Sequence, residues 1–441
     1  MRILWVCNIV LPVVAKHLNM EVSNKEGWLT GLSEQILKKQ ESNEIEFAVA
    51  CPIPEGAERF KCEVPACGTM LLSYGFCEDV SHPENYSAQL EMEIKEIIDD
   101  FRPDVVHCFG TEFAHTLAVS KVCPKEKVLV GIQGLCKLYA EAYLADLPEN
   151  VVKRVTLRDF LKKDSIPLQK EKFIARGKRE VETLQGVGNV TGRTWIDKAF
   201  TAECNGNLKY FFMNETLRSN FYEGRWELSS CEKYSMFLSQ GDYPIKGLHY
   251  MLKAMPDILK EYPEAKVYVA GNSIVRYGSF KDRLKVSSYG KYIMQLIKDL
   301  GLEDKVVFLG RLNSDEMKAQ LLKSNMFICP SVIENSPNSL GEAMLLGVPC
   351  VTAMVGGIKS IFTEGRDGIG YPGYGAEEYR DAADKESAQA ANLAKAVCRM
   401  LSDEEKMLGY TQSAKEHAQN THDGVKNYER LVEIYKEMAG K

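Results

Sequence analysis

Short apolar segments typical of strands alternate with amphipathic segments typical of helices along almost the whole chain, and this alternation restricts the fold most. It is typical of parallel sheets with helices on both faces, because each parallel strand needs a long crossover before the next one. At 441 residues the chain is too long for one ordinary core and fits two domains of about 200 residues each. We therefore predict an α/β fold with two Rossmann-like, doubly wound domains.

The predicted strands and helices form one set in each half of the chain. In the first half we expect strands at 2–8, 46–50, 105–108 and 128–132, and helices at 28–40 and 88–101. In the second half we expect strands at 234–239, 266–270, 306–309, 327–329 and 348–351, and helices at 248–262, 290–300 and 315–323. A last helix should bury one face, formed by Val425, Tyr428, Leu431, Val432 and Tyr435.

Composition and charge exclude several classes of protein. Hydrophobic residues make up 45% of the chain and charged residues 26%, as in globular proteins. The net charge of −6 gives no general attraction to nucleic acid, so no such partner is expected. No apolar run approaches the ~20 residues that cross a bilayer. The opening sequence MRILWVCNIVLP is better explained as a buried strand than as a signal peptide, and we expect a cytoplasmic protein.

Thirteen scattered cysteines indicate reduced thiols rather than a disulfide framework. Several of them fall in predicted core strands: Cys7, Cys108, Cys329 and Cys350. The alternative is a metal site, for which the candidates would be Cys62, Cys67, Cys77 and His82. Their spacing fits no standard zinc pattern, and neither half has an obvious D-x-D motif. No metal and no cofactor are expected.

A basic segment separates the two halves. Residues 153–179 carry ten basic side chains: Lys153, Arg154, Arg158, Lys162, Lys163, Lys170, Lys172, Arg176, Lys178 and Arg179. Such a run is most often the solvated surface of a helix. The alternative is a patch that faces an anionic membrane or a lipid-diphosphate acceptor, which would add peripheral contact at the inner face of the membrane.

The stretch ICPSVIENSPNSLGEAMLLGVPCV carries two glutamates, Glu334 and Glu342, eight positions apart. A short buried strand, a loop and an apolar helix at about 340–346 are predicted in this order. The N-terminus of such a helix can bind phosphate, because its first N–H groups lack partners. Carboxylates accept hydrogen bonds from sugar hydroxyls, so the arrangement suggests a nucleotide sugar. Alternatively, Ser339 and Glu342 form a capping box.

This stretch, with the following MVGGIKSIFTEGRDG, resembles the E-x7-E region of the retaining glycosyltransferases of family 4. The resemblance continues upstream through KVVFLGRLNSDEMKAQLLKSNMFICPS and GDYPIKGLHYMLKAMPDI, and it covers most of residues 235–400. It implies the GT-B architecture, in which two Rossmann-like domains face each other across a cleft. We then expect an acceptor-binding domain at 1–200, a nucleotide-sugar-binding domain at 201–420, and a C-terminal helix at 421–441 that crosses back to the first domain.

The resemblance also implies roles for residues of the second half. Lys246, in the sequence PIKG, matches the lysine with which the family binds the donor phosphates. Glu334 would accept hydrogen bonds from the donor hexose, and Glu342 would hold the ribose 2′- and 3′-hydroxyls. The first helical turn would approach sugar and phosphate through the amides of Asn338, Ser339 and Leu340.

Further donor contacts are expected where predicted strands end, because ligands bind at the carboxyl edge of open α/β sheets. Gly271 and Asn272 follow the strand KVYVAG in this way. Arg311 and Leu312 follow VVFLG and are candidate neighbours of the nucleobase. Ordinary loop chemistry is the alternative explanation for these residues.

The chain departs from the family pattern in its phosphate-binding residues. Gln240 stands where the family commonly has an arginine, and an amide supplies no charge to a diphosphate. Arg193, in NVTGRTWID, could compensate, as could Arg276 or Arg311; an ordinary salt bridge is the alternative for Arg193. In the first half, Gly27 is the glycine that fits a close approach of the backbone to the diphosphate.

A histidine that the family often carries near the reacting sugar is also missing. The corresponding place is the sequence GIQGL, with Gln133 and Gly134. His107, Glu112 and His115 in VVHCFGTEFAHT remain as polar groups for the cleft, and His107 is the catalytic candidate among them. A hydrogen-bonded core histidine is the alternative.

We predict a metal-independent, retaining hexosyltransferase that moves a hexose from a nucleoside diphosphate sugar to a hydroxyl of a glycan or lipid-linked glycan. Retention follows from the resemblance, and front-face attack is the expected course because no carboxylate of the first half stands out as a nucleophile. One alternative is a nucleotide-sugar-binding protein without transfer activity, which Gln240 and the missing histidine would explain. Another is a sugar-nucleotide epimerase.

Overall fold

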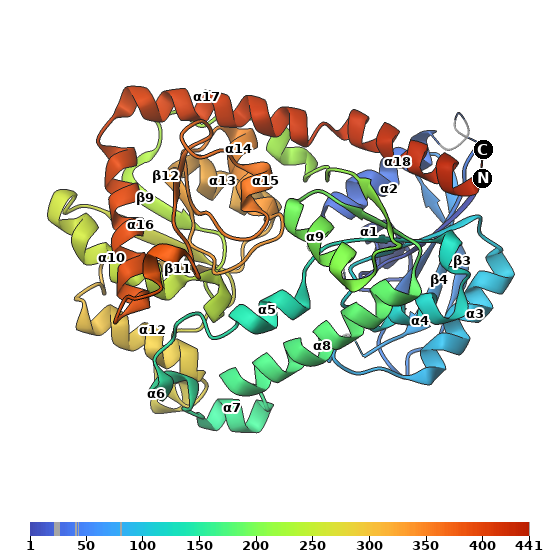
Figure 1. Cartoon of the computed structure of the whole chain (residues 1–441), viewed down its shortest axis with the longest axis horizontal. Coiled ribbons are helices and arrows are strands. Elements are labelled where there is room, and N and C mark those ends of the chain that lie inside the picture. Colours follow the sequence, from blue (N-terminus) through green and yellow to red (C-terminus); the bar gives the residue numbers. More distant parts are fainter. Residues whose placement is uncertain (22–26, 40–41, 43, 80–81, 441) are drawn as a thin grey trace. The chain divides into compact units, whose positions relative to one another are not determined.

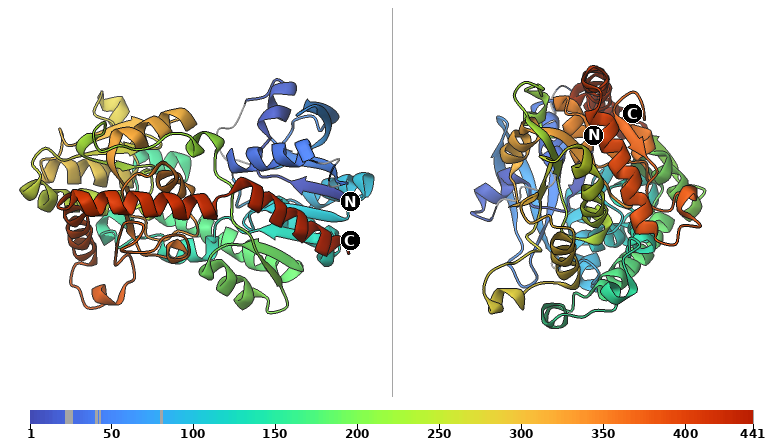
Figure 2. Two further views of the ribbon diagram at one scale, coloured as in Figure 1. Left: turned by 90° about the horizontal axis from the view of Figure 1, so that it is seen from above. Right: turned by 90° about the vertical axis from the view of Figure 1, so that its left-hand side faces the viewer.

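The computed structural model describes residues 1–21, 27–39, 42, 44–79 and 82–440, and the chain divides into two compact units (Figure 1). Unit 1 comprises Met1–Lys137, Phe173–Arg218 and His422–Lys441, and unit 2 comprises Leu138–Lys172 and Ser219–Thr421. Each unit contains one sheet, with helices on both of its sides (Figures 1 and 2). The predicted α/β class with two doubly wound sheets is confirmed.

Unit 1 is built on an eight-stranded sheet with the order β3-β4-β2-β1-β5-β6-β7-β8. Neighbouring strands are parallel except for the antiparallel pair of β3 and β4. The strands are β1 (Arg2–Val6), β2 (Glu46–Ile53), β3 (Lys61–Ala66), β4 (Thr69–Cys77), β5 (Val105–Phe109), β6 (Val128–Gly131), β7 (Asn189–Gly192) and β8 (Lys209–Phe212).

The helices of unit 1 follow the crossovers that parallel strands require. They are α1 (Pro12–His17), α2 (Gly27–Lys39), α3 (Ala88–Phe101), α4 (Ala114–Val122), α9 (Trp195–Cys204) and α18 (Gly424–Ala439). Two further helices contain the residues at which the chain passes from one unit to the other: α5 (Cys136–Ala142) and α8 (Ile166–Gly186).

The C-terminal helix α18 packs into the core of unit 1. The indole N–H of Trp5, on β1, donates a hydrogen bond of 2.7 Å to the hydroxyl of Tyr435. The ring of Trp5 also meets Phe47 and Phe109 edge-on, with centroids 5.0 and 4.8 Å apart. On α18 the predicted apolar face is buried except at its first member, Val425, which is 54% exposed. This core joins the beginning of the chain to its end.

Unit 2 is built on a six-stranded, fully parallel sheet with the order β11-β10-β9-β12-β13-β14. Its strands are β9 (Glu232–Leu238), β10 (Lys266–Ala270), β11 (Val306–Gly310), β12 (Ser324–Cys329), β13 (Cys350–Ala353) and β14 (Ile369–Tyr371). Its helices are α6 (Glu149–Val152), α7 (Leu157–Lys162), α10 (Leu248–Glu261), α11 (Phe280–Arg283), α12 (Ser288–Asp299), α13 (Ser314–Lys323), α14 (Asn338–Leu346), α15 (Ile358–Ile361), α16 (Lys385–Leu401) and α17 (Glu404–Thr421).

Local sequence signals set the ends of several helices. Asn313 caps α13 by accepting from the amide of Glu316 at 3.0 Å, while the Glu316 carboxylate accepts from the amide of Asn313 at 2.8 Å. This capping box satisfies N–H groups that a helix start leaves unpaired. Ser87 accepts from the amide of Gln89 and begins α3 in a similar way. The predicted helices at 88–101 and 315–323 therefore agree with α3 and α13.

The domain boundaries differ from the predicted ones. Residues 138–172 were assigned to the first domain but lie in unit 2, where they pack on α12. The amide of Ser288 donates to the carboxylate of Asp159 at 2.9 Å, and its hydroxyl donates to the Val151 carbonyl at 2.7 Å. Residues 201–218 belong instead to unit 1, because they contain the edge strand β8.

Four strands of unit 1 and one of unit 2 were not predicted. In the hairpin β3–β4 the outer strand β3 is largely polar. Its cysteine and Pro65 interrupt the alternation of apolar and polar residues by which a strand is recognised. The strands β7, β8 and β14 have only three or four residues, too few for a periodic signal. Among the described residues, no helix is both long and apolar enough to span a membrane.

Candidate functional site

Two loops of unit 2 meet where the order of its strands changes direction. The chain builds β9, β10 and β11 outward on one side and then returns to add β12 on the other side of β9. In open α/β sheets, ligands bind at the carboxyl edge of the strands, next to such a switch point. Lys246 follows β9 and Glu334 follows β12, so the sheet order brings both residues to this edge.

Backbone contacts fix these two loops against each other. The amide of Val332 donates to the carbonyl of Ile245 at 2.7 Å. Gly247 has a φ of +72°, and a Cβ on it would lie 2.0 Å from the carbonyl oxygen of Pro330. Only glycine fits this position, because any side chain would push the loops apart. The glycine of the PIKG sequence therefore sets the distance between Lys246 and the loop after β12.

Lys246 and Glu334 form an ion pair in which Nζ lies 2.7 Å from Oε1. The same carboxylate oxygen accepts a hydrogen bond of 2.7 Å from the hydroxyl of Ser331. Burial alone would lower the pKa of Lys246, but the Glu334 carboxylate, together with Tyr243 and Tyr139, raises it well above its ordinary value. Lys246 is therefore a fixed positive charge with its side chain still 20% exposed.

Helix α14 begins next to this pair, and its start contradicts the capping-box interpretation. Its N-cap is Pro337, which provides no side-chain hydrogen bond, and Asn338 is the first helical residue. Glu342 is therefore the fifth helical residue rather than the third, and it is buried. A glutamate reaches back to the N-cap amide only from the third position. The amide of Leu340 already donates to the Pro337 carbonyl at 3.0 Å.

The remaining predicted donor residues of unit 2 gather after β9, β10 and β11. The side chain of Arg311 donates to Asn272 at 2.5 Å, and Asn272 donates to Asp242 at 2.5 Å. Gly271 has a φ of +114°, and a Cβ on it would lie 3.5 Å from both Asp242 and Gln240. These residues therefore form one polar chain along the sheet edge. Leu312 is half-buried after Arg311.

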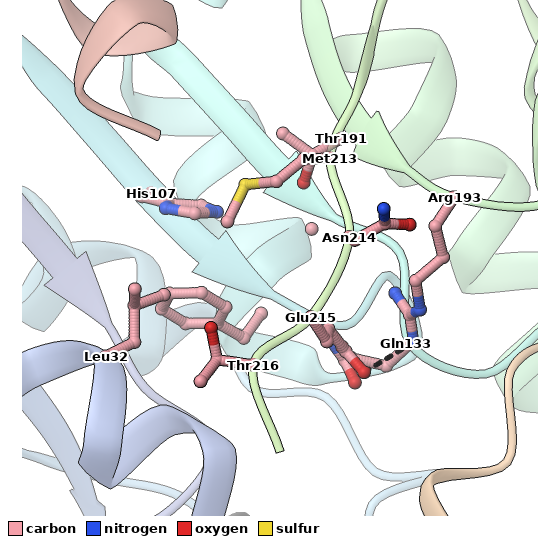
Figure 3. A pocket seen from close by; sticks show the side chains of 11 residues that line it. Leu32, His107, Gln133, Thr191, Arg193, Met213, Asn214, Glu215 and Thr216 are labelled. Atoms are coloured by element: carbon pink, nitrogen blue, oxygen red, sulfur yellow. Dashed lines mark hydrogen bonds and ion pairs between the residues drawn. The ribbon is translucent and has the colours of Figure 1, made fainter. Parts of the chain in front are cut away.

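Arg193 lies in unit 1 and forms a salt bridge there. It follows β7, and its guanidinium lies 2.9 Å from Oε2 of Glu215, which follows β8. Gln133, after β6, donates to the other oxygen of Glu215 at 2.9 Å (Figure 3). Arg193 also donates to the carbonyl of Ile132 at 2.9 Å. The salt-bridge alternative holds for Arg193, because Glu215 neutralises its charge.

His107 lies inside the sheet of unit 1 rather than at its edge. It is the third of five residues of β5, is 1% exposed, and its Nδ1 lies 2.7 Å from the hydroxyl of Tyr435. Burial lowers the pKa of His107 to about 3, so the imidazole stays neutral. It lines a small pocket together with Gln133 and Arg193 (Figure 3). The core alternative fits His107 better than the predicted catalytic role.

Glu112 and His115 belong to a buried polar cluster of unit 1. His115 Nδ1 lies 2.8 Å from the carboxylate of Glu78, and Arg176 lies 4.0 Å from Glu112. Burial would raise the pKa of Glu78, but His115 outweighs it and lowers that pKa. Gly27 is the first residue of α2, and residues 22–26 before it lie outside the described part of the chain. Gly134 lies in the turn after β6.

The structure brings no three potential metal ligands together among the described His, Cys, Asp and Glu residues. Three or more of the four residues considered for a metal are therefore not gathered into one group in the described structure: Cys62, Cys67, Cys77 and His82. All thirteen cysteines are free thiols, and those of the predicted core strands are buried. Both findings agree with the interpretation of these residues as reduced cysteines.

The basic segment is divided between the two units, with 153–172 in unit 2 and 173–179 in unit 1. Arg179 is 7% exposed and donates to the carbonyls of Glu84 at 2.7 Å and Asn85 at 3.0 Å. Its charge serves the packing of α8 against the loop before α3. A solvated helix surface is therefore the wrong description of Arg179, while Lys162 and Lys163 in unit 2 are exposed.

Sequence patterns did not reveal Ser331, Asp242 or Glu215 as neighbours of the candidate residues. Ser331 lies three residues before Glu334, and its position at a strand end was the available signal. Asp242 and Glu215 give no such signal. Their contacts depend on which strands lie side by side, and sequence periodicity does not fix that order.

The model of one protein family matches the second half of the chain, which holds Lys246, Glu334 and Glu342. This family is described as glycosyl transferases group 1, and the match covers residues 223–417. Residues 223–417 are thus similar in sequence to the group 1 glycosyl transferases. The match covers almost all of unit 2 apart from 138–172, so the predicted relation to glycosyltransferases is confirmed at this level.

Curated relatives match parts of the chain. An uncharacterized glycosyltransferase of Methanocaldococcus jannaschii is 34% identical over 138 residues, which are 31% of this chain and 31% of the relative. The N-acetyl-alpha-D-glucosaminyl L-malate synthase of Bacillus anthracis is 40% identical over 76 residues, or 17% of this chain and 19% of that enzyme. The chain thus aligns with less than a third of the length of either relative.

Solved structures resemble the whole chain, including residues 223–417. Sucrose-phosphate synthase from Thermosynechococcus elongatus covers 99% of both chains with a TM-score of 0.69 and 12% identity. Anabaena HepE, solved in complex with UDP-glucose, covers 99% of this chain and 100% of its own with a TM-score of 0.62 and 15% identity. At these identities the likeness concerns the fold alone, and the fold is the predicted GT-B type.

Proposed function

We propose that this protein is a glycosyltransferase that takes a hexose from a nucleoside diphosphate sugar bound at the carboxyl edge of the unit 2 sheet. The observation that carries the proposal is the contact between Lys246 and Glu334 at the switch point of that sheet, beside the first turn of α14. One cation, one carboxylate and a helix N-terminus suit the phosphates and hydroxyls of such a donor.

The leaving group of the reaction is a nucleoside diphosphate, on which negative charge develops. Lys246 would offset this charge directly, since its raised pKa keeps it protonated. The amides of Asn338 and Ser339 would add partial positive charge from the start of α14. The amide of Leu340 is a weaker candidate, because it already donates to Pro337.

Donor binding would also rearrange the ion pair. A phosphate oxygen that approaches Lys246 competes with Glu334 for the ammonium group. Glu334 would then turn part of its hydrogen-bonding capacity to the hydroxyls of the hexose, while Ser331 still orients it at 2.7 Å. Glu342 would hold the ribose, and Asp242, Asn272 and Arg311 would face the base.

Retention at the anomeric carbon and independence of a metal follow from the resemblance to family 4. In front-face attack, the leaving phosphate accepts the proton of the acceptor hydroxyl on the same face of the sugar. No base of this chain is needed for that step, which agrees with the buried and neutral state of His107. We propose a glycan or lipid-linked glycan as the acceptor and unit 1 as the part that binds it.

A second function, donor binding without transfer, is favoured by one observation. Arg193 is paired with Glu215 inside unit 1, and Gln240 carries no charge, so neither adds a free cation for the diphosphate. A weakly stabilised leaving group slows transfer more than it weakens binding. Turnover therefore distinguishes the two functions, whereas donor affinity does not.

The test combines donor binding with turnover. Thermal unfolding would be followed with UDP-, GDP- and ADP-sugars, since a bound donor raises the melting temperature. Release of nucleoside diphosphate would then be measured with acceptor glycans, with and without EDTA. The proposal is supported if the protein transfers a sugar and if Glu334→Gln and Lys246→Met abolish this transfer. The exposed control Glu303→Gln should preserve it.

Other outcomes decide against the proposed transfer. Donor stabilisation without turnover across the acceptor panel would favour the binding protein. Recovery of an isomerised donor without a glycoside product would indicate an epimerase. If EDTA abolished transfer and Mg²⁺ restored it, the predicted independence of a metal would be wrong, but the proposed transfer would stand.

A further inference from the structure

The exposed apolar side chains of the described residues are concentrated in one short part of unit 2. Five of them lie within residues 155–168: Val155, Leu157, Phe160, Leu161 and Leu168. Phe160 and Leu161 are the most exposed large apolar side chains of the described chain, at 72% and 71%. Scattered exposed leucines are ordinary on protein surfaces, but a contiguous cluster is typical of an interaction site.

Helix α7 carries three of these five side chains on its outer face. Leu157, Phe160 and Leu161 have the i, i+3, i+4 spacing that places side chains on one side of a helix. The acidic residue of the helix points the other way: Asp159 is 1% exposed and accepts from the amide of Ser288 at 2.9 Å. An ordinary surface helix has the opposite arrangement, with its apolar face inward.

The orientation of α7 is fixed by well-defined contacts within unit 2. Thr156 caps the helix and accepts from the amide of Asp159 at 3.1 Å. Earlier in the same segment, the carbonyl of Ala145 accepts hydrogen bonds from His249 at 3.0 Å and Tyr250 at 2.9 Å. These contacts therefore fix the apolar face of α7 toward solvent.

Basic residues surround the apolar face. Residues 151–163 contain five basic side chains and one acid, the buried Asp159, in a chain whose net charge is −6. Lys153, Lys162 and Lys163 are exposed. In the described part of the chain, no acid lies within ion-pair distance of Lys162 or Lys163. Lys153 pairs with Glu149 and Arg158 with Asp164, so the unpaired lysine charge next to the apolar side chains is that of Lys162 and Lys163. Apolar side chains beside unpaired lysines complement a surface with phosphates above an apolar layer.

We propose that α7 and its flanking residues dock on an anionic lipid bilayer. Phe160 and Leu161 enter the boundary between head groups and acyl chains, and Lys162 and Lys163 bind lipid phosphates. The predicted membrane contact of the basic segment 153–179 is thereby restricted to residues 153–168. Arg176 and Arg179, which lie in unit 1, are not part of the proposed docking surface. The docking surface does not depend on the proposed transfer reaction, so it can be tested whether or not the protein transfers a sugar.

The test measures co-sedimentation of the full chain with vesicles of phosphatidylcholine alone or mixed with phosphatidylglycerol. We expect binding to the mixed vesicles, weakened by salt and reduced at least about tenfold in the double variant Phe160→Asp/Leu161→Asp. The control is Leu408→Asp, since Leu408 is an exposed leucine of unit 2 on α17, at 46%. Thermal unfolding of each variant checks that the fold is retained.

A second pair of variants tests the charges. Lys162→Glu/Lys163→Glu should weaken binding to the mixed vesicles at least about tenfold, since each surface lysine contributes about fivefold. Lys298→Glu/Lys395→Glu, on exposed positions of α12 and α16, should change it little. Equal binding to both vesicle types, or equal loss in test and control variants, would overturn the proposal. A concentration-dependent dimer that Phe160→Asp/Leu161→Asp dissociates, without vesicle binding, would assign the face to a second copy of the chain instead.

Discussion

Lys246 and Glu334 are 88 positions apart in the sequence, yet the Nζ of Lys246 lies 2.7 Å from the Oε1 of Glu334. The side chains are 20% and 8% exposed, so each ion depends on the other for much of its stabilisation. We expect Lys246→Met and Glu334→Gln each to lower the free energy of unfolding by about 1–3 kcal/mol. The double variant should lose less than the sum, because no unpaired charge remains. Urea unfolding of the four proteins measures this coupling.

The control for this cycle uses exposed residues of the same unit. Lys359→Met and Glu303→Gln change the same types of residue at exposed positions, and their effects should be small and additive. If the Lys246 and Glu334 variants were additive as well, the ion pair would not contribute to the stability of the two loops.

The way in which α14 begins predicts that replacing Ser339 has little effect on the free energy of unfolding. Because Pro337 is the N-cap and no side chain caps the helix, Ser339→Ala should change the free energy of unfolding by less than about 0.5 kcal/mol. The comparison is Asn313→Ala at the capping box of α13, which should cost about 1 kcal/mol. Chemical unfolding of both variants measures the difference. A loss at Ser339 as large as that at Asn313 would restore the capping interpretation.

Most of the fold of unit 2 could be predicted from the sequence, because its buried parallel strands are continuous apolar runs. The strand at 266–270 and the residues that follow it agree with β10, Gly271 and Asn272. The places of Gly271, Asn272 and Arg311 after strand ends could be predicted for the same reason, while their contact with a donor stays a prediction.

The contacts between strands could not be predicted in the same way. Arg193, Glu215 and Gln133 meet because β6, β7 and β8 lie side by side, and two of these short strands gave no periodic signal. The burial of His107 was hidden for a related reason. The sequence around a histidine in a strand does not show whether its side chain is buried, as His107 is against Tyr435, or lies at the open edge of the sheet.

The spacing of the two loops predicts a strong effect at Gly247. A Cβ at this residue would lie 2.0 Å from the Pro330 carbonyl, so Gly247→Ala should lower the free energy of unfolding by about 3 kcal/mol or more. Gly375→Ala is the matched control, since Gly375 also has a φ of +72° but open space around it. Its cost should be only the backbone strain of about 1 kcal/mol. Equal losses in urea unfolding would show that strain alone, and not the contact with Pro330, requires glycine at 247.

The raised pKa of Glu180 predicts that the stability of unit 1 falls as pH rises. Burial raises the pKa of this carboxyl from an ordinary 4.5 to about 7, although it accepts hydrogen bonds from Thr111 and the amides of Cys136 and Lys137. Between about pH 4.5 and 7 the unfolded chain loses the proton while the folded protein keeps it, so the folded state binds more protons. Stability should therefore decrease through this window, by about 3 kcal/mol in total, and level off above it.

Urea unfolding at pH 5 and pH 7 measures this dependence. Glu180→Gln should flatten the slope, because an amide does not titrate, even though its loss of an acceptor lowers stability at both pH values. Glu182→Gln, two residues later on α8 and 57% exposed, should leave the slope unchanged. The slope isolates the titration from the lost hydrogen bond, since that bond is lost equally at both pH values. A slope that persists in Glu180→Gln would assign the pH dependence to other groups.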